Sequence, residues 1–348
     1  MRAVRFDAFG QPPYLAELPV PEPAPGGAVV KVAATGLCRS DWHGWQGHDP
    51  DIVTMPHVPG HEFAGTVHAV GEGVQRVRVG QRVVVPFVCG CGSCAVCRSG
   101  SAHVCPRQWQ PGFSGPGSFA EYVAVPAADF NVVELPEEVG FDVAAGLGCR
   151  FATAYRGIVE VGAVKVYDRV AVFGCGGVGL AAVMVAASRG ARVIAVDVSE
   201  EALELADEVG AAATVCSAQV DPVEAIRERC PDGVDVSVDA LGSIATADAA
   251  VRTLQTQGRH VQIGLLPPVS IGDRATVPMH VVIARELQVL GSHGMPAEDY
   301  PDMLSAIASG RLDPGRFLAR TITLEEAPEA LAAMGTPGAP AGITVIRP

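Results

Sequence analysis

Short apolar runs separated by turn residues fill the first 150 residues of the chain. Runs over 27–35, 63–70 and 81–86 are rich in valine and alanine, and glycines such as Gly71 and Gly73 punctuate them. β-Branched residues favour an extended backbone, and glycine supplies turn conformations that other residues avoid. The pattern predicts a domain made mostly of β-strands, arranged as a small barrel.

Beyond residue 151, apolar strands alternate with longer helical segments. Strands are expected at 170–173, 192–197, 213–216, 234–239 and 259–264. Helices are expected between them at 177–189, 200–210, 221–230 and 244–257. Such alternation is typical of a parallel, doubly wound sheet covered by helices. We therefore expect an α/β domain over residues 151–286.

The end of the chain breaks this alternation. A helix is expected around 300–309 and a closing strand at 343–346. We expect this tail to return to the β-rich part, so that residues 1–150 and 287–348 form one domain. A chain of 348 residues exceeds the length at which a single core usually stops growing, which agrees with two domains.

Composition and charge narrow the class of protein. Hydrophobic residues make up 49% and charged residues 18%, which is enough apolar surface for sizeable cores and argues against disorder. The net charge of −13 argues against nucleic acid as a partner, because phosphate binding requires clustered lysine and arginine. The sequence also lacks a basic amphipathic stretch for a membrane surface.

One uncharged segment, residues 170–188, has about the length of a membrane span. A glycine-rich break interrupts it after a few residues, which favours a buried strand, a turn and a buried helix. The N-terminus lacks an apolar leader. We therefore expect a soluble, cytoplasmic protein.

Five of the ten cysteines lie within residues 89–105, which indicates a shared metal ion. The spacing Cys91-x2-Cys94-x2-Cys97-x7-Cys105 supplies four thiolates, enough to close a tetrahedral zinc site. A disulfide framework is the alternative, but it requires an oxidising compartment. Cys89 and His103 lie in the same loop and could compete as ligands.

The sequence Gly174-Cys-Gly176-Gly177-Val178-Gly179 joins a predicted strand to a predicted helix. In that setting the first glycine permits a tight turn, the second lets the backbone approach a pyrophosphate, and the last lets helix and strand pack closely. The helix N-terminus would face the phosphates with unpaired N–H groups. This motif predicts a dinucleotide site of the Rossmann type.

Asp197 ends the strand that follows this motif, near the position of a ribose-binding carboxylate. A carboxylate there accepts hydrogen bonds from the ribose hydroxyls and repels a 2′-phosphate. The following residues, Val198-Ser-Glu-Glu-Ala202, contain no lysine or arginine to neutralise that phosphate. The sequence therefore predicts NAD rather than NADP.

Further metal-ligand residues occur away from the cysteine cluster. Cys38 lies in Cys38-Arg-Ser-Asp-Trp-His43, His61 is followed by Glu62, and Cys149 stands alone in the sequence. Catalytic zinc takes three protein ligands and keeps a fourth position open. Cys38 and His61 are candidates for such a site. Cys149 could supply the third ligand or could be a buried small thiol.

In their order along the chain, these motifs resemble the zinc-dependent alcohol dehydrogenases, which are zinc-containing medium-chain dehydrogenases/reductases. The resemblance covers essentially the whole chain. It implies a GroES-like β-barrel catalytic domain, with a structural-zinc lobe at 88–106 and a Rossmann domain inserted before the C-terminal tail. It also implies two zinc ions per chain and a homodimer or homotetramer.

The resemblance implies roles for the residues around the reactive metal. Cys38, His61 and Cys149 would bind catalytic zinc, Glu62 would be an alternate ligand, and Asp41 would orient His61. Ser40 would accept the hydroxyl proton of the substrate, and His43 would pass it to solvent. Phe87 resembles a wall of the substrate pocket, although it could equally be a core aromatic residue.

Other residues resemble the contacts that the family makes with its cofactor. Arg39 resembles a pyrophosphate contact, and Thr153 and Val178 resemble residues that press on the nicotinamide ring. Ile263, near the end of the strand expected at 259–264, and Leu265, just after it, complete the expected cofactor site.

We therefore expect reversible, NAD-dependent oxidation of a primary or secondary alcohol by hydride transfer at a zinc site. A zinc-dependent reductase of another C=X bond, such as an imine, or an aldehyde dismutase on the same scaffold is the alternative. A zinc-ribbon or RING-like module would separate its cysteine pairs by a longer loop. A zinc-free reductase of this fold would lack Cys38, His61 and the cluster.

Overall fold

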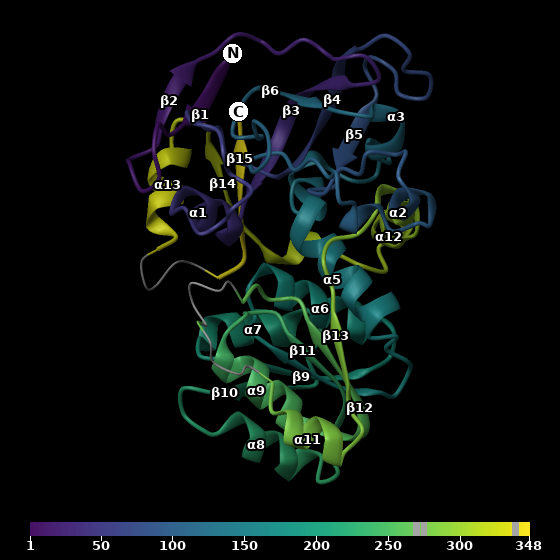
Figure 1. The fold of residues 1–348 in the computed structure, drawn as a ribbon. Helices are drawn as coiled ribbons and strands as arrows, with labels where there is room; N and C mark the ends of the chain where they lie inside the picture. The colour runs from purple at the N-terminus through teal and green to yellow at the C-terminus, as the bar shows by residue number, and fades with distance from the viewer. Residues whose placement is uncertain (267–271, 273–276, 336–340) are drawn as a thin grey trace. The chain divides into compact units, whose positions relative to one another are not determined.

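The computed structural model describes residues 1–266, 272, 277–335 and 341–348, which fold into two units (Figure 1). The first unit contains Met1–Ala152 and Gly294–Pro348. The second contains Thr153–His293. The first unit is thus discontinuous in sequence, and the second is inserted into it.

Most strands of the first unit form one sheet of seven strands in the order β14-β15-β3-β4-β5-β7, with β6 also paired to β3. Their bounds are β3 Ala28–Leu37, β4 Glu62–Val70, β5 Arg82–Val85, β6 Tyr122–Val125, β7 Val133–Glu134, β14 Leu318–Thr323 and β15 Ile343–Arg347. A separate hairpin-like pair joins β1 Arg2–Arg5 to β2 Tyr14–Glu17. Within the described residues, the end strands β14 and β7 do not pair with each other, so these strand pairs do not close the sheet into a barrel.

The end of the chain completes this sheet. Strand β15 pairs antiparallel with β3, and Thr344 lies opposite Leu37. Strand β14 then pairs in parallel with β15. Residues more than 300 positions apart in sequence are therefore neighbours in one sheet.

Short helices occupy the connections of the first unit. They are α1 Arg39–Trp45, α2 Ala95–Arg98, α3 Ala128–Asn131, α4 Phe141–Ala144, α12 Tyr300–Ala308 and α13 Ala327–Ala333. Single 3₁₀ turns are η1 Ala102–Val104, η4 Ala297–Asp299 and η5 Pro314–Phe317, and η2 Leu147–Phe151 is a π-turn. Helix α5 Ala152–Arg156 continues from η2 toward the second unit. π-Turns are rare and are often found at functional sites.

The second unit is built on a six-stranded sheet in the order β10-β9-β8-β11-β12-β13. All neighbouring strands are parallel. The bounds are β8 Arg169–Phe173, β9 Arg192–Asp197, β10 Ala213–Cys216, β11 Val234–Asp239, β12 Leu254–Gln262 and β13 Gln288–Gly291. If β8 is numbered 1, the strand order is 3-2-1-4-5-6, which is the order of dinucleotide-binding sheets. In such sheets the ligand binds at the carboxyl ends of the strands, at the point where the strand order reverses.

Helices cover this sheet (Figure 1). They are α6 Gly177–Ser188, α7 Glu200–Glu208, α8 Pro222–Arg229, α9 Ile244–Thr253 and α11 Met279–Ala284, with a π-turn η3 at Gly157–Val161. Helix α6 packs on β8 and β9, and its residues 179–186 are buried without a break. That burial accounts for the uncharged segment 170–188. The fold class expected from the sequence is confirmed.

Two details of this unit differ from the sequence-based expectation. The helix expected at 244–257 ends at Thr253, and strand β12 begins at Leu254 rather than at 259. A bulge explains the early start, because Val234 pairs with Leu254 while Val236 already pairs with Arg259. Helix α11 and strand β13 are short and were not expected from the sequence.

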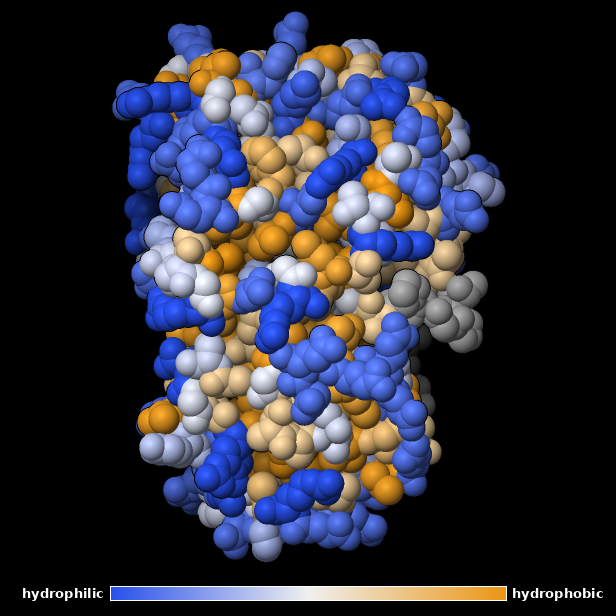
Figure 2. Space-filling view, turned by 180° about the vertical axis from the view of Figure 1, so that it is seen from behind, coloured by the Kyte–Doolittle hydropathy of each residue, from blue (hydrophilic) through white to orange (hydrophobic). Residues whose placement is uncertain are grey.

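Among the described residues, no helix combines the length and the apolar character that a membrane span needs. Figure 2 shows one face of the molecule, on which apolar side chains are interspersed with polar and charged ones.

Candidate metal and cofactor sites

The structure brings Cys38, His61, Glu62 and Cys149 together in the first unit. One ligand atom from each lies within 4.8 Å of every other. Cys38 is the N-cap of α1, His61 directly precedes β4, and Cys149 lies in the π-turn η2. Three distant segments of the sequence thus converge on one position, as a metal site requires.

The imidazole of His61 is held in one orientation. Its Nδ1 lies 2.7 Å from Asp41 Oδ1, and both side chains are fully buried. Asp41 also accepts hydrogen bonds from the backbone N–H of Gly60 (3.1 Å) and of Cys38 (3.0 Å). Asp41 therefore fixes the ring and at the same time ties the segments that carry His61 and Cys38.

The other ring nitrogen, His61 Nε2, is buried, faces the Cys38 thiol and makes no hydrogen bond of acceptable geometry within the described part of the chain. Leaving such an atom unpaired costs free energy, so its lone pair needs an acceptor. A metal ion between this nitrogen and the thiols of Cys38 and Cys149 would satisfy it. The residues present therefore fit zinc, which accepts histidine nitrogen and cysteine sulfur.

The two thiols of this group interact. A hydrogen bond from Cys149 lowers the pKa of the Cys38 thiol well below its usual value, and the positive charge of Arg150 acts in the same direction. Burial raises the pKa of the Glu62 carboxyl, and the positive charge of Arg150 opposes that rise and favours the carboxylate. A thiolate at Cys38 is the form that binds metal.

Two buried residues of this site escaped sequence reasoning. Arg150 Nε lies 2.8 Å from Glu62 Oε1, so a guanidinium stands behind the metal group. The hydroxyl of Tyr300, on α12, donates to the carbonyls of Gly148 (3.1 Å) and Leu147 (3.4 Å) and pins η2. A charged residue beside a candidate metal thiol was the available signal for Arg150; nothing in the local sequence marked Tyr300.

Aromatic rings border the metal group. The ring centroid of Phe87 lies 6.1 Å from that of His61, and the centroid of Phe113 lies 5.1 Å from it. Both side chains are buried. Phe87 therefore lies beside the metal group, a position compatible with either a pocket wall or a core aromatic residue, and Phe113 is a second ring that the sequence did not single out.

Helix α1 carries the residues expected to handle the proton and the cofactor. Its Ser40 is half-buried. His43 Nδ1 lies 3.0 Å from Nδ1 of His48, so one of the two rings donates to the other. Burial lowers the pKa of His43, and the nearby charges of His48 and Arg39 lower it further. The Arg39 guanidinium lies 4.7 Å from the ring centroid of Trp42.

The cysteine cluster forms a second group, separate from the first. The thiol sulfurs of Cys91, Cys94, Cys97 and Cys105 lie within 4.8 Å of one another, and all ten cysteines are free. Cys89 lies outside this group, with its sulfur 3.6 Å from the carbonyl of Pro86. Four sulfurs at this spacing fit a closed tetrahedral zinc site.

The glycine motif connects β8 to α6 in the second unit. Gly174 adopts a φ of 89°, and a Cβ atom at position 179 would lie 1.7 Å from the Gly174 carbonyl oxygen. Both positions thus require glycine, one for the turn and one for the close approach. Gly176 is the N-cap of α6, and Gly177 and Val178 form its first turn.

Asp197 lies at the end of β9, beside this turn. Its Oδ2 accepts a hydrogen bond of 2.6 Å from the backbone N–H of Cys175, and its Oδ1 accepts one of 2.9 Å from that of Ser199. The carboxylate therefore stands next to the loop that would hold the pyrophosphate. That geometry suits a ribose contact.

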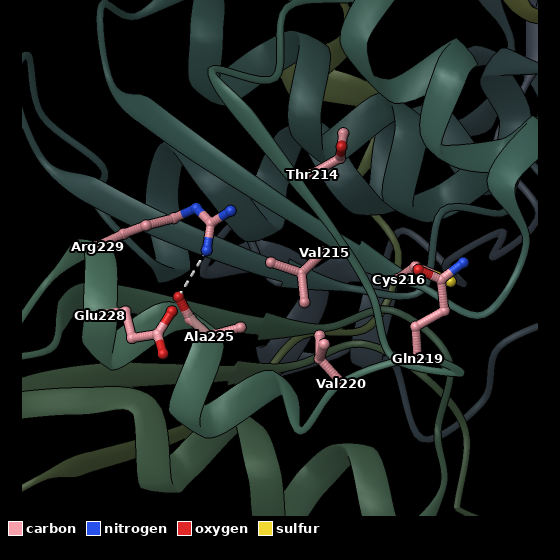
Figure 3. Close-up of a pocket in the computed structure, with 8 residues that line it drawn as sticks. All are labelled: Thr214, Val215, Cys216, Gln219, Val220, Ala225, Glu228 and Arg229. Atoms are coloured by element: carbon pink, nitrogen blue, oxygen red, sulfur yellow. Dashed lines mark hydrogen bonds between the residues drawn. The ribbon is translucent and has the colours of Figure 1, made fainter.

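The other expected cofactor residues also lie in the second unit. Thr153 is buried at its start, Ile263 follows β12 and is buried, and Leu265 is 59% exposed. A separate pocket of about 230 Å³ in this unit is shown in Figure 3; it is lined by Thr214, Val215, Cys216, Gln219, Val220, Ala225, Glu228 and Arg229. None of the residues predicted to bind cofactor lines that pocket.

Comparisons with known proteins agree with this geometry. The alcohol dehydrogenase GroES-like domain matches residues 24–137, and the zinc-binding dehydrogenase domain matches residues 177–309. An alcohol dehydrogenase of Geobacillus stearothermophilus is 34% identical over 313 residues, covering 90% of each chain. An NAD-dependent alcohol dehydrogenase of Sulfurisphaera tokodaii is 32% identical over 340 residues, covering 95% of each.

Solved structures are similar over the full chain. An alcohol dehydrogenase from Thermus sp. ATN1 superposes with a TM-score of 0.89 at 31% identity, over 100% of this chain and 99% of the other. A thermostable alcohol dehydrogenase from Pyrobaculum aerophilum, solved with cobalt and zinc bound, has a TM-score of 0.87 at 28% identity, with coverage of 100% and 99%.

Proposed function

The chain belongs to the zinc-dependent alcohol dehydrogenase family, and we propose that it oxidises a primary or secondary alcohol reversibly at a zinc held by Cys38, His61 and Cys149. It is an NAD-dependent, zinc-containing oxidoreductase. The observation that carries the proposal is the buried, unpartnered His61 Nε2 beside two thiols within ligand distance.

When bound, zinc supplies a Lewis acid for the substrate oxygen and NAD accepts the hydride. The protein's own residues orient and desolvate the reactants. Asp41 keeps His61 Nδ1 protonated, so that Nε2 faces the metal position. Phe87 and Phe113, beside the His61 ring, exclude water from that side of the site.

The proton of the substrate hydroxyl leaves along α1 in this proposal. Ser40 accepts it, and His43 then receives it. The Nδ1 of His48, 3.0 Å from Nδ1 of His43 and on an exposed side chain, offers a route onward to solvent. The lowered pKa of His43 favours its neutral form, which can accept a proton near neutral pH.

We assign the second zinc to Cys91, Cys94, Cys97 and Cys105 as a structural ion. Four thiolates leave no open position for substrate, so this site holds the 88–106 lobe together. The charge of the cluster is partly balanced, because Arg107 Nη2 donates to Cys91 sulfur over 3.2 Å.

We further propose a cytoplasmic location and a homodimer or homotetramer. Ten free cysteines suit a reducing compartment. Strand β13 lies at the edge of its sheet with an exposed Val289, and Ile283 on the preceding helix α11 is 74% exposed. An edge with exposed apolar side chains is a natural surface for a second copy of the chain.

A spectrophotometric panel tests the proposed reaction. Purified protein is assayed with primary, secondary, allylic and aromatic alcohols, each with NAD and with NADP, by the absorbance of the reduced cofactor. We expect turnover with NAD on at least one class of alcohol and its abolition in Cys38→Ala, with one zinc lost per chain. Cys216→Ala is the matched control, because Cys216 lies in neither metal group.

Two results would contradict the proposal. Activity that survives in Cys38→Ala would remove that residue from the catalytic site. No turnover with any alcohol, together with turnover of an imine or another C=X substrate, would assign the site to the alternative reductase chemistry.

A further inference from the structure

Glu62 and Arg150 form an ion pair next to the metal group. Arg150 Nε lies 2.8 Å from Glu62 Oε1, and the two side chains are 8% and 0% exposed. Arg150 also donates from Nη1 to the carbonyl of Leu37 over 3.0 Å. The guanidinium is therefore fixed in one place, away from solvent.

The backbone of β3 leaves room for this guanidinium. A Cβ atom at Gly36 would lie 2.5 Å from Arg150 Nη2 and 2.8 Å from the carbonyl oxygen of Ala145. Any larger residue at position 36 would push Arg150 out of its position. The cation is thus part of the construction of the site rather than an incidental neighbour.

The carboxylate of Glu62 has free lone pairs despite this pairing. Neither of its oxygens has a hydrogen bond of acceptable geometry among the described residues. Its Oε1 lies 4.0 Å from His61 Nε2, and Glu62 is one of the four residues whose ligand atoms fall within 4.8 Å. Glu62 is therefore within reach of two cations, the metal and Arg150.

The charges balance in pairs. A divalent metal is neutralised by the thiolates of Cys38 and Cys149, and Glu62 is neutralised by Arg150. Without Arg150, the metal would be the nearest cation available to a carboxylate that cannot reach water. A buried charge that loses its partner is strongly unfavourable, so the carboxylate would turn to the metal.

We propose that Arg150 is a positioning residue that holds the Glu62 carboxylate back from the metal and so keeps the fourth coordination position open. The inference rests on the proposed function in one respect only, namely that the substrate binds at this open position. Arg150 acts through Glu62 and does not itself contact the reacting atoms.

Cobalt substitution tests this inference with the full-length protein, without NAD or alcohol. Cobalt replaces zinc, and the spectrum of Cys38→Ala protein is subtracted to remove the contribution of the four-cysteine site. In Arg150→Gln we expect the visible absorption bands of cobalt to change in position and intensity. Added imidazole, the probe for the open position, should bind roughly tenfold more weakly or worse, because Glu62 occupies that position.

The double variant Glu62→Gln/Arg150→Gln is the matched control, since it removes the carboxylate together with its partner. It should recover the wild-type cobalt bands and imidazole affinity. A cobalt spectrum and an imidazole affinity in Arg150→Gln equal to those of the wild type would overturn the inference, as would a change that persists in the double variant.

If Arg150→Gln does not fold, Arg150→Lys is measured instead. It keeps the charge but loses the planar fork, so a smaller change in the same direction is expected, and wild-type behaviour in both probes counts against the inference. Failure of the alcohol panel would leave these measurements unaffected, because they use neither alcohol nor NAD. A wrong substrate and a wrong role for Arg150 are therefore distinguishable.

Discussion

At the scale of single residues, two buried histidines show how hydrogen bonding separates a ligand from a structural group. His61 has one ring nitrogen on Asp41 and the other without a partner. His260, also fully buried, has both nitrogens paired, Nδ1 with Ser237 Oγ at 3.0 Å and Nε2 with Gln262 Oε1 at 3.1 Å. The unpaired nitrogen of His61 is therefore the informative feature, since burial is common to both.

His260 gives a prediction about acid stability. Burial lowers its pKa below the value of about 6.5 that it has in the unfolded chain. The unfolded state therefore binds more protons below that pH, and the stabilisation present above it is lost as the pH falls. In His260→Gln we expect the free energy of unfolding to fall less steeply between about pH 7 and 5, by up to about 1.4 kcal/mol per pH unit.

Urea unfolding of both proteins at several pH values measures this difference. Metal loss at low pH affects both proteins alike, so the comparison isolates the histidine. Parallel pH profiles for the two proteins would contradict the expectation.

At the scale of elements, short segments carry the metal and cofactor residues. Contacts with residues outside or at the ends of these segments hold them in place. The four-residue helix α2 is capped by Cys94, whose sulfur accepts from the N–H of Cys97 over 3.3 Å. The turn η2 is held by Tyr300, and the glycine turn is held by Asp197. Each site therefore depends on an element that would not persist alone in water.

The lobe at 88–106 gives a prediction about its metal. Cys94→Ala removes one of four sulfurs and the cap of α2, so we expect one zinc per chain to be lost and the melting temperature to fall. Metal analysis by mass spectrometry and thermal unfolding measure both effects. Cys216→Ala should retain two ions. Retention of two ions in Cys94→Ala would remove that residue from the cluster.

The end of β9 gives a prediction about cofactor choice. Asp197→Ala removes a negative charge that repels the 2′-phosphate, so the ratio of kcat/KM for NADP to that for NAD should rise about tenfold or more. The ratio is the proper measurement, because loss of the hydrogen bond to Cys175 loosens the turn for both cofactors. Asp207→Ala, exposed on α7, is the control; an unchanged ratio in Asp197→Ala would argue against a ribose contact.

The sequence predicted much of the fold and the candidate ligands for identifiable reasons. Strong periodicity in the second half indicated the parallel sheet, and the family resemblance connected Cys38, His61 and Cys149, which spacing alone could not. The predicted zinc and NAD are confirmed by the family and its relatives. The early start of β12 depends on a bulge against β11, and the location of Arg150 depends on space beside Gly36. The bulge leaves no local signal in the sequence, and the charge of Arg150 beside Cys149 marks the residue but not the space that receives it.

At the scale of the whole molecule, one edge of the second unit's sheet, formed by strand β13, is exposed. Among the residues that the structure describes, strand β13 pairs with β12 on one side and with no strand on the other, and three of its four residues are exposed. With a net charge of −13, copies of the chain repel one another at long range, so association needs a local apolar contact. We propose strand β13 and helix α11 as the surface for such a contact.

This edge gives a prediction about assembly. We expect the protein to be a dimer or tetramer by size-exclusion chromatography with light scattering, and Val289→Glu to shift it to a smaller species. The substitution would bury a carboxylate against the second copy of the chain, which is unfavourable and separates the subunits. Val220→Glu, at a valine that is 51% exposed against 41% for Val289 and lies beyond the opposite edge strand β10, should leave the mass unchanged. A wild-type monomer, or an unchanged mass in Val289→Glu, would count against this surface.

The discontinuity of the first unit has a consequence for how the protein is made. After Cys149 the ribosome must add about 190 more residues before strand β15, which begins at Ile343, is synthesised. At about 5–20 residues per second this takes roughly 10–40 s. During that interval all three thiol and imidazole ligands exist, but η2 lacks the hydroxyl of Tyr300 and β3 lacks its neighbour β15. Metal insertion at Cys38, His61 and Cys149 is therefore expected to be a late event that waits for Tyr300 and strand β15 to be synthesised.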